Sequence, residues 1–248
     1  MSLMAFENPL ISNARMRTMY RALVETRALG SNLGRGRRLP KGLEACWVGT
    51  GIDLSHSDFT SNSTGGALND YIRAVGKREA AGAASVADVR GLLAAKAEPF
   101  VGTATDRLLC AVGAAMAVKR TKAGHIVMAY VNAGNLSKPD WKRVVAAGGR
   151  SNLPLILVVT PTKSSTSPSA PGIPVIPVDA GDAIALYRVA QESILRARSE
   201  GGMVVIDCVA MGADPVKILG RQLITKGIAT ERWIKNVEEH FCQTLARL

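Results

Sequence analysis

The chain has 248 residues, 47% of them hydrophobic, and this length is enough to bury a sizeable core in one large α/β domain or two small ones. We favour one domain spanning residues 1–248. No apolar run approaches the roughly 18 residues that a membrane-spanning helix needs, and the opening MSLMAFENPL lacks the features of a signal peptide. We therefore expect a cytoplasmic protein with no membrane partner. The four cysteines share no short spacing, so we expect Cys110 and Cys208 to be buried thiols rather than metal ligands.

The formal net charge of +11 allows an anionic partner, such as nucleic acid or an acidic protein surface. The densest basic cluster, Arg35 to Lys41, has glycine and proline but no interleaved aromatic residue. Aromatic residues make up only 4% of the chain, and proteins that bind single strands use aromatic platforms for stacking. Nucleic acid is therefore the less favoured partner, and the cluster itself is interpreted as a solvated loop.

The first hundred residues are dominated by helical patterns. An apolar stripe ringed by arginines predicts a long helix from Asn8 to Leu33, and the segment SDFTSNSTGG at 57–66 is interpreted as a polar loop. An Ala-rich helix follows at 103–119, with Leu108, Val112 and Met116 expected on its buried side. Further helices are predicted at 43–52, 67–76 and 86–97.

The centre of the chain predicts a strand, a helix and a second strand. Ile126 to Val131 and Leu155 to Val159 are short apolar runs typical of buried strands. Between them, Ser137 and Pro139 are typical of a helix start. Two buried strands joined by one helix form a parallel, right-handed crossover.

The remaining third of the chain continues the alternation of strands and helices. A Ser/Pro-rich surface loop is expected at 163–172. Strands are predicted at 175–178 and 203–208, and helices at 182–198, 214–223 and 231–248, with Leu195 on the buried face of the first. The pattern predicts an α/β fold with a parallel sheet flanked by helices on both faces, made of N-terminal helices (8–100), a central sheet core (101–208) and C-terminal helices (214–248).

The carboxyl ends of the two central strands are the predicted ligand crevice, because ligands bind at that edge of parallel sheets. The candidate binding residues there are Asn132, Gly134, Asn135, Thr162 and Lys163. Each has a plainer interpretation: asparagine favours turns, and a loop lysine is commonly solvated.

Three acidic residues and one histidine are further candidates for a functional role. Glu44 either faces a pocket or partner, or pairs with an arginine, while Asp58 is expected to have a structural role in a turn. Asp207 is a weak catalytic candidate, with pairing to a basic group preferred, and His125 is interpreted as a residue at a strand start.

The order of these elements resembles the alpha subunit of the E1 component of the thiamine-diphosphate-dependent 2-oxo acid dehydrogenases, of pyruvate, branched-chain or acetoin type. The resemblance covers nearly the whole chain, in a shortened form. It is carried by MRTMYRALVETRALG, GLEACWVGTGIDLSHSDF, VDAGDAIALYRVAQESILRARSEGGMVVIDC and DPVKILGRQLITKGIATERWIKNVEEH. It implies the thiamine-diphosphate-binding fold and the label of an oxidoreductase component.

The same resemblance implies that the cofactor site is degenerate. The family holds thiamine diphosphate through Mg²⁺, using the Asp of a Gly-Asp-Gly motif and a later Asn; here Ala133 and Thr162 occupy these positions. The family's Tyr-Arg pair falls near Thr64-Gly65, and its His-containing loop is reduced to Val209–Ala213. We therefore expect no metal ligand and no cofactor, with Mg²⁺ and thiamine diphosphate as the family alternative.

Three functions stay open on the sequence. The first is an E1-alpha-like subunit without Mg-thiamine diphosphate binding or decarboxylase activity of its own, assembled as a homodimer or with a beta-like subunit. The second is an active E1 component that decarboxylates a 2-oxo acid oxidatively together with a beta-subunit partner. The third is a non-enzymatic binding module whose basic surface docks an acidic protein, an acyl carrier or a nucleic acid.

Overall fold

The computed structural model describes residues 11–32, 41–62, 67–78, 89, 102–162 and 170–247. The predicted helix at 86–97, apart from Val89, lies outside these residues, as do Arg35, Arg37 and Arg38 of the basic cluster and Lys163. No helix within the described ranges is long and apolar enough to cross a membrane.

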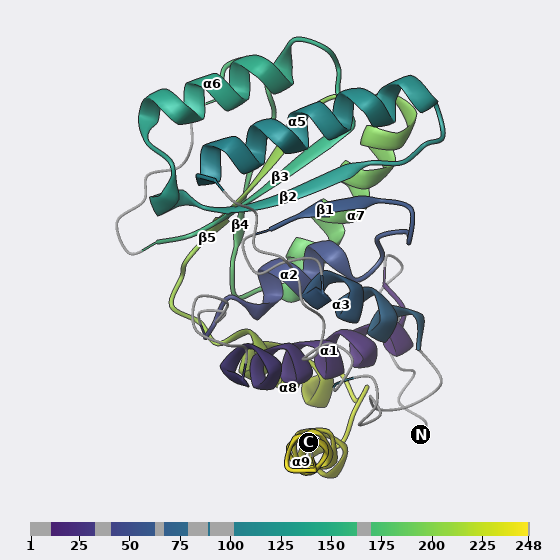
Figure 1. Cartoon of the computed structure of the whole chain (residues 1–248). Coiled ribbons are helices and arrows are strands. Elements are labelled where there is room, and N and C mark those ends of the chain that lie inside the picture. The colour runs from purple at the N-terminus through teal and green to yellow at the C-terminus, as the bar shows by residue number, and fades with distance from the viewer. Residues whose placement is uncertain are drawn as a thin grey trace.

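Five parallel strands form one sheet in the order β1-β2-β3-β5-β4, with helices on both of its faces (Figure 1). The predicted α/β class, parallel sheet and two covered faces are confirmed. The strands are β1 (Phe59–Ser61), β2 (Val127–Asn132), β3 (Leu155–Thr160), β4 (Val175–Asp179) and β5 (Val204–Val209). The helices are α1 (Asn13–Asn32), α2 (Glu44–Gly51), α3 (Ala67–Lys77), α5 (Ala104–Thr121), the short 3-10 helix η1 (Ala133–Asn135), α6 (Lys138–Gly149), α7 (Ala183–Ser199), α8 (Pro215–Thr225) and α9 (Glu231–Leu245).

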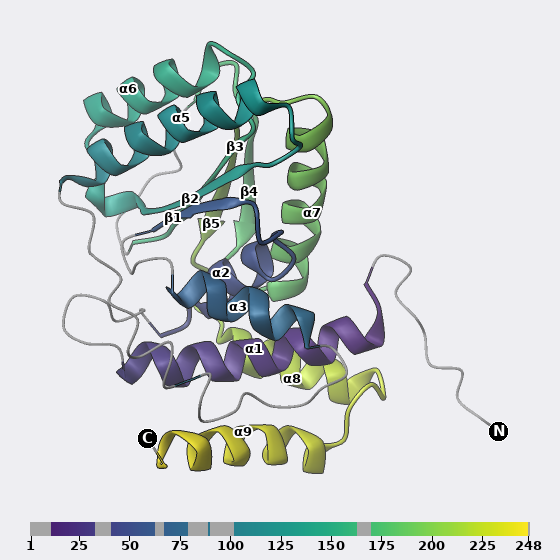
Figure 2. The same cartoon turned by 45° about the vertical axis from the view of Figure 1, so that its right-hand side comes forward.

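The order of the strands explains why α6 and α7 cover opposite faces. The chain moves one way across the sheet from β2 through α6 to β3, and the other way from β4 through α7 to β5. Since both crossovers obey the same handedness, their helices must lie on opposite sides. Figures 1 and 2 show α5 and α6 above the sheet, with α2 and α7 against its other face and α1, α8 and α9 in further layers beneath.

Two apolar cores result, one on each face of the sheet. Alternate residues of a strand point to opposite faces, so Leu155, Leu157 and Val159 of β3 pack under α5 and α6, while Ile156 and Val158 pack against the other layer. All six residues of β3 are buried, as expected for a central parallel strand.

Helix starts agree with the capping signals in the sequence. Ser137 accepts a hydrogen bond from Asp140 N at the start of α6, and Thr230 accepts one from Trp233 N at the start of α9. Thr103 and Asp106 form a reciprocal capping box at the start of α5. The first helix begins at Asn13 rather than Asn8, because Ser12 accepts a hydrogen bond from Arg15 N.

The interpretation of residues 57–66 as a polar loop was wrong in part. Phe59–Ser61 forms the edge strand β1, paired with Val127 to Ala129 of β2. An edge strand pairs on one side only, so three residues are enough to form β1. So short a segment shows no alternation of apolar and polar residues that would predict a strand. The sheet therefore extends into a segment that the sequence predicts to be a polar loop between N-terminal helices.

Three side chains expected to be buried are exposed. Met116 of α5 is 43% exposed and Leu195 of α7 is 66% exposed, because each lies beyond the arc of its helix that faces the sheet. Cys110 is exposed on α5, whereas Cys208 is buried as expected.

Helix α2 packs so closely on α7 that Gly49, one of its two glycines, has no room for a side chain. A Cβ atom on Gly49 would lie 2.7 Å from Leu186 Cβ and 3.0 Å from Ala183 O. We expect Gly49→Ala to lower the free energy of unfolding by about 1–3 kcal/mol, measured by urea denaturation, because backbone atoms must move to admit the methyl group.

Gly113 on α5 provides the matched control, since a Cβ atom added there meets nothing within 4 Å. Gly113→Ala is expected to raise the free energy of unfolding by up to about 1 kcal/mol through helix propensity. Equal effects of the two substitutions would contradict the close contact between α2 and α7.

Candidate functional site

The ends of β2 and β3 meet at one edge of the sheet, as predicted. Asn132 and Thr160 are register partners, and η1 follows the first strand while Pro161 and Thr162 follow the second. Figure 1 shows this edge where β2 turns through η1 into α6.

Asn132 uses its side chain to hold this edge together. Its Oδ1 atom accepts a hydrogen bond from Gly134 N at 3.0 Å, and its Nδ2 donates to Pro161 O at 3.3 Å and to Thr160 Oγ1 at 3.5 Å. The amide therefore closes the turn after β2 and links it to the end of β3. This is the turn chemistry that was the plainer interpretation of this residue.

Gly134 and Thr162, both expected at this edge, lie against one another. A Cβ atom on Gly134 would lie 2.9 Å from Thr162 Cγ2, so the threonine methyl group occupies the space beside the glycine. Ala133 is half-buried and packs against the core beneath α5 and α6, whereas Asn135 is exposed. Of the five candidate residues, Asn132, Gly134 and Thr162 thus form one cluster, Asn135 stands apart, and Lys163 is not described.

Two carboxylates at or just after the end of β4 have structural roles, and a third, on β5, is buried. Asp179, at the end of β4, accepts a hydrogen bond from Gly181 N, and Asp182 caps α7. Asp207 is 6% exposed, and its Oδ2 has no hydrogen-bond partner within the described ranges, so the expected basic partner is not found there. It lies beside Val159 and Pro177 in the sheet.

No metal site emerges from these side chains. Among the described residues, no group of three or more His, Cys, Asp or Glu side chains is placed to hold a metal ion. His56 and His240 are exposed, and His125 lies half-buried ahead of β2.

A network of ion pairs outside the predicted crevice joins three helices. Arg27 of α1 donates to Glu44 at 2.9 Å and to Asp214 at 2.8 Å, which are the first residue of α2 and the N-cap of α8. Glu44 is 1% exposed and also accepts a hydrogen bond from Gly42 N. Of the two roles weighed for Glu44, the structure shows the pairing with arginine.

The network also shifts the pKa of Asp214. Partial burial opposes ionisation of Asp214, but hydrogen bonds from Arg27, Lys217 N and Val216 N outweigh it and hold the pKa of this carboxyl below its ordinary 3.8. No local pattern in the sequence predicts this network, since Glu44 and Asp214 lie 17 and 187 positions from Arg27.

Asp58 has the structural role that was expected. Its carboxylate accepts hydrogen bonds from Ser55 N and Ile126 N and pairs with Arg198 of α7 at 2.5 Å. It therefore fixes the turn before β1 to the start of β2 and to the end of α7.

The two buried cysteines lie together in the core between α2 and the sheet. A hydrogen bond between Cys46 of α2 and Cys208 of β5, together with burial, raises the pKa of the Cys46 thiol well above its usual value. A thiol in this state is a weak nucleophile.

No protein-family model matches the chain, and no curated protein matches it significantly.

We expect Arg27→Met to lower the free energy of unfolding at neutral pH by about 3–5 kcal/mol, measured by urea denaturation, because it leaves Glu44 buried without its cation. Arg188→Met, at an exposed arginine of α7, should stay within about 0.5 kcal/mol. A loss at Arg27 no larger than at Arg188 would show that the network contributes nothing to stability.

The lowered pKa of Asp214 predicts a dependence on acid. The ionised carboxylate stabilises the fold above pH 3.8, and this contribution is lost as the pH falls through the lower pKa of the folded state. The difference in free energy of unfolding between the native chain and Asp214→Asn should therefore shrink below pH 3.8, when urea denaturation is repeated across this range. A difference that stays constant or grows in acid would contradict this assignment.

Proposed function

We propose that the chain is an E1-alpha-like subunit with the thiamine-diphosphate-binding fold, without Mg-thiamine diphosphate binding or decarboxylase activity of its own. The resemblance in sequence carries the family assignment. The parallel sheet with helices on both faces, and the β2-η1-α6-β3 crossover at the matched motif positions, are what that assignment requires. The single observation that carries the loss of binding is the cluster of Asn132, Gly134 and Thr162.

The residues at the family's ligand positions do not fit the metal. Mg²⁺ takes near-octahedral oxygen ligands, with carboxylates preferred, and the methyl group of Ala133 offers none. The Thr162 methyl group packs beside Gly134, and the amide oxygen of Asn132 already accepts a hydrogen bond from Gly134 N. These side chains thus contact one another at the edge of the sheet, where metal ligands would have to point into the crevice. We therefore assign no catalytic step to the cofactor.

Under this proposal the chain acts through assembly. It pairs as a homodimer or with a beta-like subunit, as members of the family that it resembles do. Light scattering at micromolar concentration tests this part: a stable monomer, alone and with a co-expressed beta-like protein, would contradict it.

The test of the binding site is a calorimetric titration of thiamine diphosphate with Mg²⁺ into the chain. We expect no heat of binding, because the matched positions lack the metal ligands. Binding that requires Mg²⁺ would overturn the proposal and favour an active E1 component.

Restoring the ligands provides the complementary test. Ala133→Asp with Thr162→Asn should gain a Mg²⁺-dependent stabilisation by thiamine diphosphate, amounting to about 1.4 kcal/mol at a ligand concentration tenfold above Kd. The control double variant Ala146→Asp with Thr121→Asn, at exposed positions of α6 and α5, should gain none. A gain in the control would show that the effect is unrelated to the family's ligand positions.

A further inference from the structure

The positive charge of the chain is concentrated on one layer of the molecule. Residues 103–152, which include α5 and α6, carry eight Lys or Arg and two Asp, a net charge of +6 out of +11. Residues 183–247, which include α7, α8 and α9, carry nine Lys or Arg against seven Asp or Glu, a net charge of only +2. The charge therefore belongs chiefly to the layer that covers one face of the sheet.

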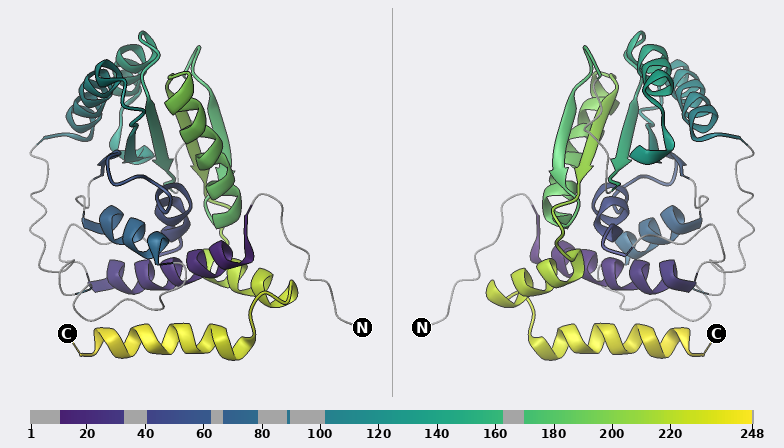
Figure 3. Two further views of the ribbon diagram at one scale, coloured as in Figure 1. Left: turned by 90° about the vertical axis from the view of Figure 1, so that its right-hand side faces the viewer. Right: turned by 90° about the vertical axis from the view of Figure 1, so that its left-hand side faces the viewer.

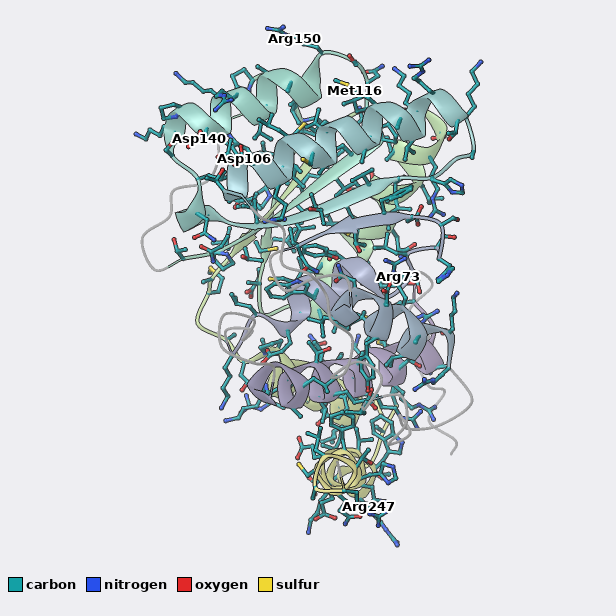
Figure 4. The ribbon with its side chains drawn as sticks, viewed as in Figure 1. Arg73, Asp106, Met116, Asp140, Arg150 and Arg247 are labelled. Atoms are coloured by element: carbon teal, nitrogen blue, oxygen red, sulfur yellow. The ribbon has the colours of Figure 1, made fainter. Side chains whose placement is uncertain are left out.

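Seven of these eight basic side chains are exposed, and they surround the outer surface of the two helices. We call this surface the α5–α6 face; its basic residues are Lys119, Arg120, Lys122, Lys138, Lys142, Arg143 and Arg150. Figure 4 shows Arg150 at the end of α6 and Met116 on α5, with Asp106 and Asp140 near the starts of the two helices. Asp140 is engaged by Arg143 at 3.7 Å, and Asp106 by the hydrogen bonds of its capping box.

The α5–α6 face also exposes one large apolar side chain and several small residues. Met116 is 43% exposed, and it shares a stripe of α5 with Gly113 and Arg120, three residues before and four residues after it. Gly113 has open space where a side chain would be, and Ala117 and Ala146 are small and exposed. Small residues let another helix approach closely, and an exposed methionine adapts to the surface that it meets.

A second copy of this chain does not suit the face. In a two-fold dimer the same patch meets itself, and two clusters of seven basic side chains would then be brought together. A single-stranded nucleic acid also suits it poorly, because the only aromatic side chain of α5 and α6, Trp141, is buried and offers no stacking platform.

We propose that the α5–α6 face docks an acidic amphipathic helix of another protein. The apolar side of that helix covers Met116 and Gly113, and its carboxylates meet the surrounding arginines and lysines. This inference does not rest on the proposed function, because it uses neither the crevice nor the family resemblance.

The test uses the full chain and a labelled synthetic helical peptide rich in Glu, Leu and Ala, with fluorescence anisotropy as the measurement. A peptide with Gln in place of Glu, and a duplex DNA of equal charge, are the comparison ligands. We expect the acidic peptide to bind more tightly than both, with an affinity that falls as salt rises from about 50 to about 200 mM.

Charge reversal locates the site. Arg120→Glu with Arg150→Glu should weaken binding of the acidic peptide by at least about tenfold, whereas Arg188→Glu with Lys217→Glu, on α7 and α8, should change it by less than about threefold. Both double variants alter the net charge equally, and thermal melting checks that both fold. Equal weakening by the two would mean that only the overall charge acts, which would overturn the proposal.

Substitution of Met116 distinguishes binding of an amphipathic protein helix from binding of a polyanion that has no apolar side. Met116→Gln should weaken binding of the peptide by about threefold or more, while Leu195→Gln, at the exposed leucine of α7, should leave it unchanged. DNA binding as tight as that of the peptide, or peptide binding that ignores Met116, would overturn the assignment to an amphipathic helix. These outcomes are independent of any titration with thiamine diphosphate, so the two proposals can fail separately.

Discussion

The burial of β2, β3 and β5 on both faces is the constraint on which the rest of the structure depends. A parallel strand of this kind leaves no face for water, so the chain must supply a helical layer on each side. The five-stranded order then sends α6 and α7 to opposite faces, and the apolar residues of β3 are shared between two cores. The side view in Figure 3 shows the consequence: the α5 and α6 layer on one side is thin and faces solvent, while the other side continues through several layers to α9.

The regular elements could be predicted from the sequence because their signals are local. The apolar runs of β2 and β3, the Ser137 cap and the Asp214-Pro215 helix start each depend on residues within one turn or one strand. The edge strand β1 could not be predicted, because its pairing comes from β2, 68 positions along the chain. The same applies to Met116 and Leu195, whose exposure depends on which side of the helix faces the sheet. The spacing of apolar residues does not decide whether a residue at the border of the apolar stripe is buried.

The candidate site divides in the same way. Its location, at the ends of β2 and β3, follows from parallel topology and was predicted. What the residues do there depends on contacts across 28 or 29 positions, such as Asn132 with Thr160 and Pro161, and no periodicity encodes these. The Arg27 network is still less accessible to prediction, since charged residues are common and only the fold selects Glu44 and Asp214 as partners.

The pairing of β1 also bears on how the chain reaches its folded state. β2 and β3 are joined by a single helix, whereas β1 must wait for a partner 68 residues away, with α3 and α5 placed in between. Closing a longer loop costs more chain entropy before the contact can form, so strand pairings between distant segments form late. We therefore expect the β2-α6-β3 unit to form early in folding. Strand β1 should be the last strand to join the sheet, where the carboxylate of Asp58 then binds Ile126 N and Arg198.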